Sequence, residues 1–236
     1  FPESTEIEFI SSQRESRILA ALEDREKFCK KLFSAYKIAR ATVAECAELL
    51  NCCRLLFFNS ILDYDLPIPA SDGSDLTQTT ERNDASKCDS LVMDILALVS
   101  SARLKLLEPL SRHFEGKIFV PFTVLDELLM AKHHLTNSRR TKLLIKVGSG
   151  VALAENSEDT IRAEIELVSD IERFVKEKCV VTFSYFSLDS NRDEIDFERE
   201  SIGLSTYDAA HIARETGALM YTDDLKCSQY FRQRWG

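Results

Sequence analysis

Four acidic residues occupy corresponding places in this chain, each close behind a short apolar segment or at the start of a helical one. Asp94 ends "LVMD", Glu127 follows "KIFVPFTVLD", Asp208 begins "DAAHIARE", and Asp224 follows "ALMYTD". In open parallel sheets, ligands bind beyond the carboxyl ends of the strands. If the apolar segments are such strands, these four carboxylates, distant in sequence, meet at one edge of the sheet.

Carboxylates gathered in a partly buried place disfavour each other's charged form and raise each other's pKa. A divalent cation removes this cost, and a site built from oxygen ligands alone suits Mg²⁺ or Mn²⁺ better than zinc. Such ions serve phosphodiester hydrolysis, in which they polarise the phosphate, activate a water molecule and stabilise the leaving oxygen. The four acids therefore predict a metal-dependent centre that cleaves phosphodiesters.

Each acid also has a purely structural interpretation. The spacings Ser205-x-x-Asp208 and Thr123-x-x-Asp126 fit capping boxes at helix starts. The acidic pair before "LKCSQYFRQRW" fits a helix N-cap, and the first acid fits a solvated strand end. Taken singly, each acid favours the structural interpretation, whereas their shared position at the predicted sheet edge favours the metal site.

The elements that must position these acids follow from the hydrophobic periodicity. Residues 4–60 carry apolar side chains at helical spacing without Pro or Gly, whereas residues 63–87 have the composition of a linker or long loop. Beyond them, short strands alternate with helices, which is typical of a parallel sheet covered on both faces. We expect strands at 90–94, 117–120, 179–186 and 218–221, helices at 95–114, 123–135, 157–177 and from 205, and an acidic loop at 188–203.

Composition limits the class of protein. A chain of 236 residues can bury a sizeable core, and its net charge of −9 argues against a surface coated for bulk nucleic-acid binding while leaving room for a local basic groove. No apolar run approaches the roughly 18 residues of a membrane span, so we expect a soluble chain. The seven cysteines lack Cys-x-x-Cys pairs and indicate reduced thiols in the cytoplasm, with the nucleus left open. Phe1 in place of an initiator Met indicates a processed or excised piece.

Other folds with acidic or phosphate-binding sites do not fit the order of residues. A haloacid-dehalogenase-like phosphatase needs Asp-x-Asp after its first strand, but Asp94 is followed by Ile95 and Leu96. A response-regulator receiver has its acidic pair early, whereas this chain has it last. The sequence contains neither a Gly-x-x-x-x-Gly-Lys-Ser/Thr loop nor a Gly-x-Ser-x-Gly turn.

Three blocks resemble the successive blocks of PIN-domain nucleases: "LVMDILAL", "GKIFVPFTVLDELL" and "LSTYDAAHIARETGALMYTDD". They match a strand followed by Asp, then Pro with Val-Leu-x-Glu-Leu, then Asp-Ala at a helix start with Thr-x-Asp after a strand. The last block is the most specific. The resemblance covers about residues 88–236 and implies a three-layer α/β/α sandwich around a parallel sheet. The family's usual activity is Mg²⁺- or Mn²⁺-dependent cleavage of single-stranded RNA by a metal-activated water.

Read residue by residue, the resemblance implies a metal-binding and catalytic set of Asp94, Glu127, Asp208 and Asp224. Two assignments are ambiguous by one position, because Asp126 precedes Glu127 and Asp223 precedes Asp224; the motif spacing favours the second of each pair. Asp89 is a weaker candidate for the first acid, since no apolar strand precedes it. Additional site candidates are Asp223, Asp126, Thr222 and Thr206.

The resulting organisation is an N-terminal all-helical region (1–62), the linker or long loop (63–87) and a PIN-like nuclease domain (88–236). The basic stretch "AKHHLTNSRRTKLLIKVGSG" follows the helix of Glu127 and predicts an RNA-binding rim; a solvated helix face is an equally good interpretation. The candidates there are Lys132, Arg139, Arg140 and Lys142. The N-terminal helices could pack on the sandwich, bind a protein partner or mediate a homodimer.

Two other functions stay open at this stage. Many PIN domains have Thr or Ser and then Asn after the first acid, where this chain has Ile95 and Leu96. That departure favours a catalytically degenerate PIN module that serves as a binding or assembly scaffold. A structure-selective DNA nuclease of related fold is the remaining alternative.

Overall fold

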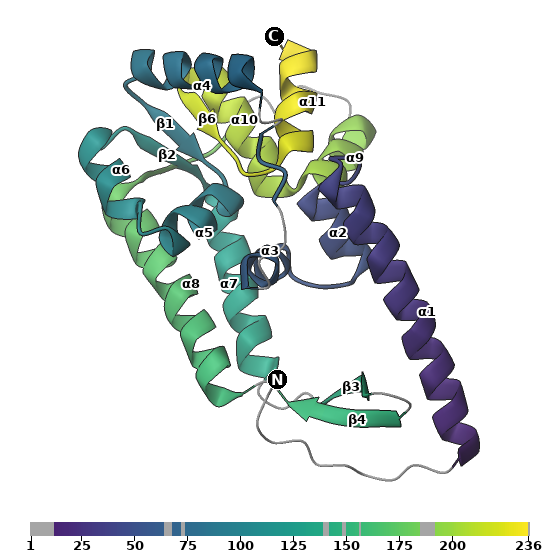
Figure 1. Ribbon diagram of the computed structural model, residues 1–236. Coiled ribbons are helices and arrows are strands. Elements are labelled where there is room, and N and C mark those ends of the chain that lie inside the picture. The colour runs from purple at the N-terminus through teal and green to yellow at the C-terminus, as the bar shows by residue number, and fades with distance from the viewer. Residues whose placement is uncertain are drawn as a thin grey trace.

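The computed structural model describes residues 12–63, 68–71, 74–138, 142–147, 150–155, 157–184 and 192–235. At its centre lies a four-stranded parallel sheet of order β5-β2-β1-β6 (Figure 1). Leu91 of β1 pairs with Ile118 of β2 and with Leu219 of β6, so the strands end at a common edge. The strands are β1 (Leu91–Met93), β2 (Ile118–Pro121), β5 (Val180–Thr182) and β6 (Leu219–Tyr221).

Helices cover both faces of this sheet. On one face the strand residues pack against three helices, α5 (Ile95–Arg103), α7 (Phe122–Ser138) and α8 (Glu158–Lys178), in the largest hydrophobic cluster. On the other face Val92 of the central strand packs against Ala209 and Ile212 of α10 (Leu204–Thr216). Because successive side chains of a strand point to opposite faces of the sheet, the apolar strand residues pack against the helices on both faces. The fold is therefore the predicted three-layer α/β/α sandwich.

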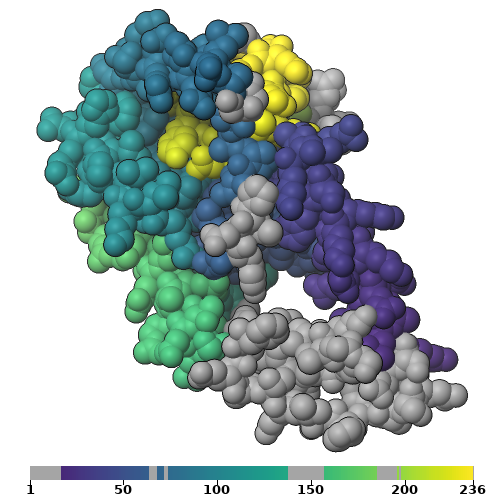
Figure 2. All heavy atoms as spheres, in the orientation of Figure 1, coloured from purple at the N-terminus to yellow at the C-terminus, as the bar shows by residue number. Residues whose placement is uncertain are grey.

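The N-terminal helices belong to the same hydrophobic core. They are α1 (Ser12–Lys37), α2 (Val43–Leu49) and α3 (Arg54–Asp63). Tyr36, Val43 and Phe58, one from each helix, lie buried in the cluster that also holds β1 and β2 residues. Helix α3 packs against α5 and α7, and α2 packs against α9 (Arg192–Ile202). Figure 2 shows the purple N-terminal helices lying directly against the yellow C-terminal residues.

Several elements were not expected from periodicity. Helix α4 (Asp75–Lys87) lies in the stretch predicted as a linker or long loop; it is capped by Ser74 and buries none of its side chains, so it has no apolar pattern. Helix α9 replaces most of the predicted acidic loop. Residues after α7 form an antiparallel hairpin of β3 (Lys142–Val147) and β4 (Gly150–Glu155), of which only the backbone is described.

The remaining helices are short and lie at the edges of the sandwich. They are α6 (Leu107–His113), between α5 and β2, and the C-terminal α11 (Leu225–Trp235), which buries Cys227 and Phe231. None of the helices in the described part of the chain is long and apolar enough to cross a membrane.

Candidate carboxylate site at the edge of the sheet

The fold brings the four predicted acids to the carboxyl-terminal edge of the sheet. Asp94 directly follows β1, and Asp224 lies three residues beyond the end of β6. Glu127 lies in the second turn of α7, the helix that follows β2, and Asp208 lies in the second turn of α10. The strands and the helix starts thus place these side chains as the sequence predicts.

Asp94 is fully buried and caps α5. One carboxylate oxygen, Oδ1, accepts a hydrogen bond of 2.9 Å from the backbone N–H of Ala97. The other oxygen, Oδ2, accepts hydrogen bonds from the hydroxyls of Thr206 and, at 2.8 Å, Thr222. Both threonines named as additional candidates therefore converge on the first acid. Oxygens engaged in this way are held in one orientation.

The two residues after Asp94 do not reach the site. Ile95 and Leu96 are both at most 1% exposed and belong to the main hydrophobic cluster. Their apolar character serves the packing of α5 between the sheet and α3. The hydroxyl groups around the first acid come instead from Thr206 and Thr222, on two other elements.

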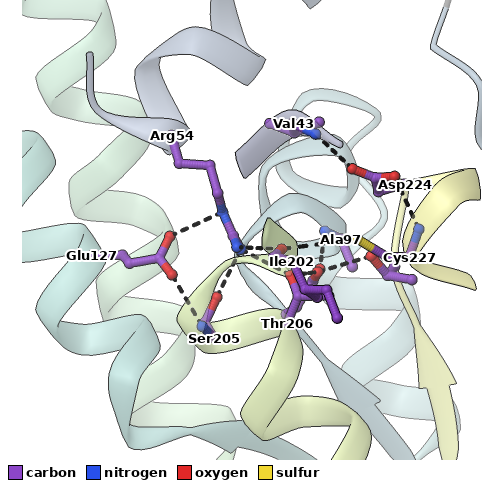
Figure 3. Close-up of polar contacts among 11 residues, drawn as sticks. Val43, Arg54, Ala97, Glu127, Ile202, Ser205, Thr206, Asp224 and Cys227 are labelled. Carbon is purple, nitrogen blue, oxygen red and sulfur yellow. Dashed lines mark hydrogen bonds and ion pairs between the residues drawn. The ribbon is translucent and has the colours of Figure 1, made fainter. Parts of the chain in front are cut away.

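Asp224 is almost completely buried and joins the C-terminal helix to the N-terminal region. Its Oδ1 accepts from the N–H of Cys227 at 3.2 Å, which caps α11, and its Oδ2 accepts from the N–H of Val43, the first residue of α2, at 2.7 Å (Figure 3). Burial raises the pKa of Asp224, and the charge of Asp94 adds to this. The two backbone hydrogen bonds and the charge of Arg54 oppose the rise.

Glu127 forms an ion pair with an arginine from the N-terminal region. Nε of Arg54, the first residue of α3, lies 3.3 Å from Oε2 of Glu127, and the arginine side chain is only 9% exposed. The other carboxylate oxygen, Oε1, accepts from the backbone N–H of Ser205 at 3.2 Å. Of the pair Asp126 and Glu127, it is Glu127 that faces the other acids, whereas Asp126 is exposed.

The other two nitrogens of Arg54 donate to the end of α9 and the start of α10. Nη1 donates to the carbonyl oxygen of Ile202 at 3.3 Å, and Nη2 donates to the hydroxyls of Ser205 at 2.9 Å and Thr206 at 3.0 Å (Figure 3). Gly203, at a φ of +92°, leaves room for the guanidinium: a Cβ on it would lie 1.5 Å from Nη1. A side chain at Gly203 is therefore incompatible with Arg54 in this place.

Asp208 is buried on α10 and bonded to two other elements. Its Oδ2 accepts from the hydroxyl of Thr123 at 3.0 Å, and Nη2 of Arg199 lies 3.7 Å from its Oδ1. Burial raises its pKa; the Thr123 bond and the charge of Arg199 oppose this, while the charge of Glu127 adds to it. Asp208 and Glu127 therefore interact through their charges.

Two predicted caps at this edge are wrong. Helix α10 starts at Leu204 with Gly203 as its N-cap and no side-chain cap, so the Ser205 and Asp208 side chains are free to face the site. Helix α7 starts at Phe122, one residue before Thr123, whose hydroxyl bonds Asp208. The cap predicted for the final acidic pair is confirmed at Asp224, whose carboxylate accepts from the N–H of Cys227. The solvated strand end considered for Asp94 is wrong, because Asp94 is fully buried and caps α5.

The predicted RNA-binding rim is only partly within the described residues. Lys132 forms an ion pair with Glu172 of α8, and this bond lowers the pKa of Glu172. Arg139 and Arg140 lie outside the described residues, and Lys142 is described only as the first backbone position of β3. The rim stays a prediction.

A pocket of about 500 Å³ opens beside the ion pair, between the turn that joins α2 to α3 and the first half of α7. Glu127, Arg54 and Gly203 line it, together with Asp126 and Met130 of α7. This pocket gives solvent and solutes access to the side of the carboxylate cluster on which Arg54 lies.

A metal ion does not fit the side chains as they stand in this conformation. Among the residues that the structure describes, no three His, Cys, Asp or Glu side chains are placed to share an ion. The chemistry of the donors, carboxylates with threonine hydroxyls, suits Mg²⁺ or Mn²⁺. Most of their oxygens, however, already accept hydrogen bonds from backbone N–H groups or hydroxyls. Oε2 of Glu127 accepts none, and Nε of Arg54 lies 3.3 Å from it.

Sequence reasoning missed Arg54 and Gly203. The only local signal was that Arg54 is the single charged residue between Glu48 and Asp63, in the apolar stretch "CCRLLFF". Such a charge on a buried helix needs a partner, because an unpaired buried charge is costly. The partner itself, on α7, is set by the tertiary fold and has no local signature.

The carboxyl group of Asp223 is expected to make stability depend on pH. Burial raises its pKa from 3.8 to about 6, the charge of Asp94 adds to this, and a hydrogen bond from Ser100 opposes it. The folded state then holds a proton that the unfolded state has released between about pH 4 and pH 6. In metal-free buffer the free energy of unfolding should therefore fall as pH rises through this window.

Asp223→Asn should remove this dependence. The variant should be more stable than the wild type at pH 7 by up to about 3 kcal/mol, and the difference should vanish near pH 4. Urea unfolding at a series of pH values measures it. An equal stability difference at pH 4 and pH 7 would show that Asp223 ionises normally.

Comparison with known families agrees with this architecture. Residues 92–233 match the family described as the PIN domain associated with the TPR-GreAB-C-PIN system, which covers more than half of the chain. No curated protein and no solved structure matched. With its four-stranded parallel sheet between helical layers, this chain belongs to the PIN-domain family, whose fold is of the nuclease type.

Proposed function

We propose that this protein is an endoribonuclease that hydrolyses phosphodiester bonds of single-stranded RNA with Mg²⁺ or Mn²⁺ as its cofactor. The observation that carries the proposal is the gathering of Asp94, Glu127, Asp208 and Asp224 at the carboxyl-terminal edge of a PIN-type sheet. Burial and repulsion from a neighbouring acid raise the pKa of Asp208 and of Asp224. Such raised pKa values reflect an electrostatic destabilisation that is typical of functional sites and that a purely structural role of these residues does not explain.

Two exposed aromatic rings beside this edge support a single-stranded substrate. Phe122 and Phe183 are 39% and 60% exposed and stack on each other, with ring centroids 4.8 Å apart. Phe122 directly precedes Thr123, which is bonded to Asp208, so the aromatic pair adjoins the acids. Unpaired bases stack on such rings whatever their sequence, which paired bases in a duplex cannot do.

A non-catalytic PIN module is the second candidate, and one observation favours it. In the described residues Arg54 supplies the positive charge that a metal would otherwise bring to Glu127. A PIN domain whose acidic site is permanently occupied by an arginine would cleave no nucleic acid and would bind partners through its surface. The N-terminal helices would be the natural binding region, through the exposed side of α1, for a protein partner or a second copy of the chain.

Replacing single acids should separate these candidates. Asp208→Asn should abolish Mn²⁺-dependent cleavage of single-stranded RNA without unfolding the chain, because an asparagine oxygen can still accept the bond from Thr123. Asp94→Asn should do the same, since asparagine can still cap α5. Cleavage is followed on a labelled single-stranded RNA, and folding by circular dichroism.

Asp89→Asn is the matched control, because Asp89 is an exposed acid near β1 whose only described ion pair is with Lys117, away from the site. It should cleave like the wild type. Undiminished cleavage by both Asp94→Asn and Asp208→Asn would refute the assignment. No cleavage by any form of the chain, flap DNA included, would favour the non-catalytic module; cleavage of flap DNA alone would favour a DNA nuclease.

The aromatic pair should contribute to RNA binding without taking part in cleavage. Phe122→Ala and Phe183→Ala should each weaken binding of a labelled single-stranded RNA in EDTA by about tenfold, since stacking of one base is worth about 1–3 kcal/mol. Fluorescence anisotropy measures the affinity. Leu129→Ala, at an exposed residue of the same helix α7, is the control. Equal affinity in both phenylalanine variants would exclude the pair as a stacking surface.

A further inference from the structure

We propose that Arg54 and a divalent metal ion compete for the acidic site at Glu127, so that the Arg54 side chain, presented by the N-terminal region, closes the site until it is displaced. This inference rests on the proposed function, because it assigns a regulatory role to residues around the same acids. Nothing in the PIN match requires it, since that match begins at residue 92, well after Arg54.

The place that Arg54 occupies is built for a cation. Its guanidinium lies within ion-pair distance of the Glu127 carboxylate, and it donates hydrogen bonds to the backbone carbonyl oxygen of Ile202 and to two hydroxyl oxygens. These are oxygen acceptors throughout, which is also the ligand type that Mg²⁺ and Mn²⁺ prefer. Thr206 joins the two halves of the site, because its hydroxyl oxygen accepts from Arg54 while it donates to Asp94.

The electrostatic effect of Arg54 reaches beyond Glu127. Its positive charge lowers the pKa of Asp224, whereas the charge of Asp94 raises it. One buried guanidinium therefore offsets part of the repulsion among the acids. A divalent ion in the same place would offset more of it, so the two occupants are alternatives and not partners.

A second contact of the N-terminal segment blocks another acid. The N–H of Val43 donates to Oδ2 of Asp224, and Lys226 of α11 is bonded to Glu45 of α2 at 2.6 Å. The hydroxyl of Thr42 donates to the carbonyl oxygen of Ser201. These contacts thus hold α2 against Asp224, as the ion pair holds Arg54 against Glu127.

The side chain of Arg54 can move without unfolding the sandwich. Arg54 is the first residue of α3, and the turn before it contains Asn51 and Cys52, both exposed, with Asn51 at a φ of +51°. The residues that anchor α3, Leu55 and Phe58, point into the core and are independent of the guanidinium. Release of Arg54 therefore requires a change of side-chain conformation and of a short turn.

Metal affinity tests the competition directly, without any measurement of cleavage. Thermodynamic linkage requires that whatever holds Arg54 on Glu127 weakens metal binding by the same factor. Mn²⁺ should bind the Arg54→Gln variant at least about tenfold more tightly than the wild-type chain, measured by isothermal titration calorimetry. Arg54→Lys, which keeps the charge, should tighten binding less. Asp208→Asn in the Arg54→Gln chain should abolish the tight binding.

Arg103→Gln is the matched control. Arg103 is also an arginine bonded to side chains of α3, Asn59 and Asp63, but it is exposed and lies away from the four acids. Its Mn²⁺ affinity should equal that of the wild type. A loss of packing alone would weaken metal binding in every variant and would not tighten it in Arg54→Gln.

If the Arg54→Gln variant is too unstable for calorimetry, its melting temperature with and without Mn²⁺ provides a second measurement. Glu127 is then left without its cation, and Mn²⁺ should raise the melting temperature of the variant by more than that of the wild type. Equal or weaker Mn²⁺ binding, together with an equal or smaller rise in melting temperature, would overturn the inference. RNA cleavage that depends on Asp208 would in that case leave the proposed function standing. Tighter metal binding without cleavage would leave the inference standing and refute the function.

Discussion

The ion pair between Arg54 and Glu127 is the interaction on which the rest of this site depends. Four carboxylates at one edge of a sheet repel each other, and the ends of β1 and β6 and the second turns of α7 and α10 place them there in spite of that cost. A buried charge that loses its partner destabilises a protein by several kcal/mol, about 3–5 in measured cases. The N-terminal region supplies the compensating charge, so it is a component of the site and not an appendage to it.

The packing explains how a residue outside the matched PIN segment comes to lie among the PIN acids. Helix α3 buries Leu55, Phe58 and Ile61 against α5 and α7, the helices that begin at or carry two of the acids. This burial fixes the start of α3 opposite Glu127. Gly203 then provides the space, since any side chain there would collide with the guanidinium. The position of Arg54 is therefore a result of core packing and of one missing Cβ.

The sequence predicted those parts of the fold that have a local pattern. The short apolar segments that alternate with helical ones predicted the four parallel strands. The acids that follow these segments predicted the edge of the sheet at which Asp94 and Asp224 lie. Helix α4, which is polar on every side, and the Arg54–Glu127 pair have no such pattern: a polar helix lacks apolar periodicity, and an ion pair between distant segments depends on tertiary contacts. The capping prediction for Ser205 and Asp208 failed for a related reason, because Gly203 starts α10 two residues earlier.

A structure determined with saturating Mn²⁺ tests the central claim most directly, because Mn²⁺ can be located by its anomalous scattering. The account predicts a metal peak between the carboxylates of Asp94, Asp208 and their neighbours, with the guanidinium of Arg54 withdrawn from Glu127. A metal peak at these carboxylates with Arg54 still bonded to Glu127 would contradict it, because the two cations would then share the site.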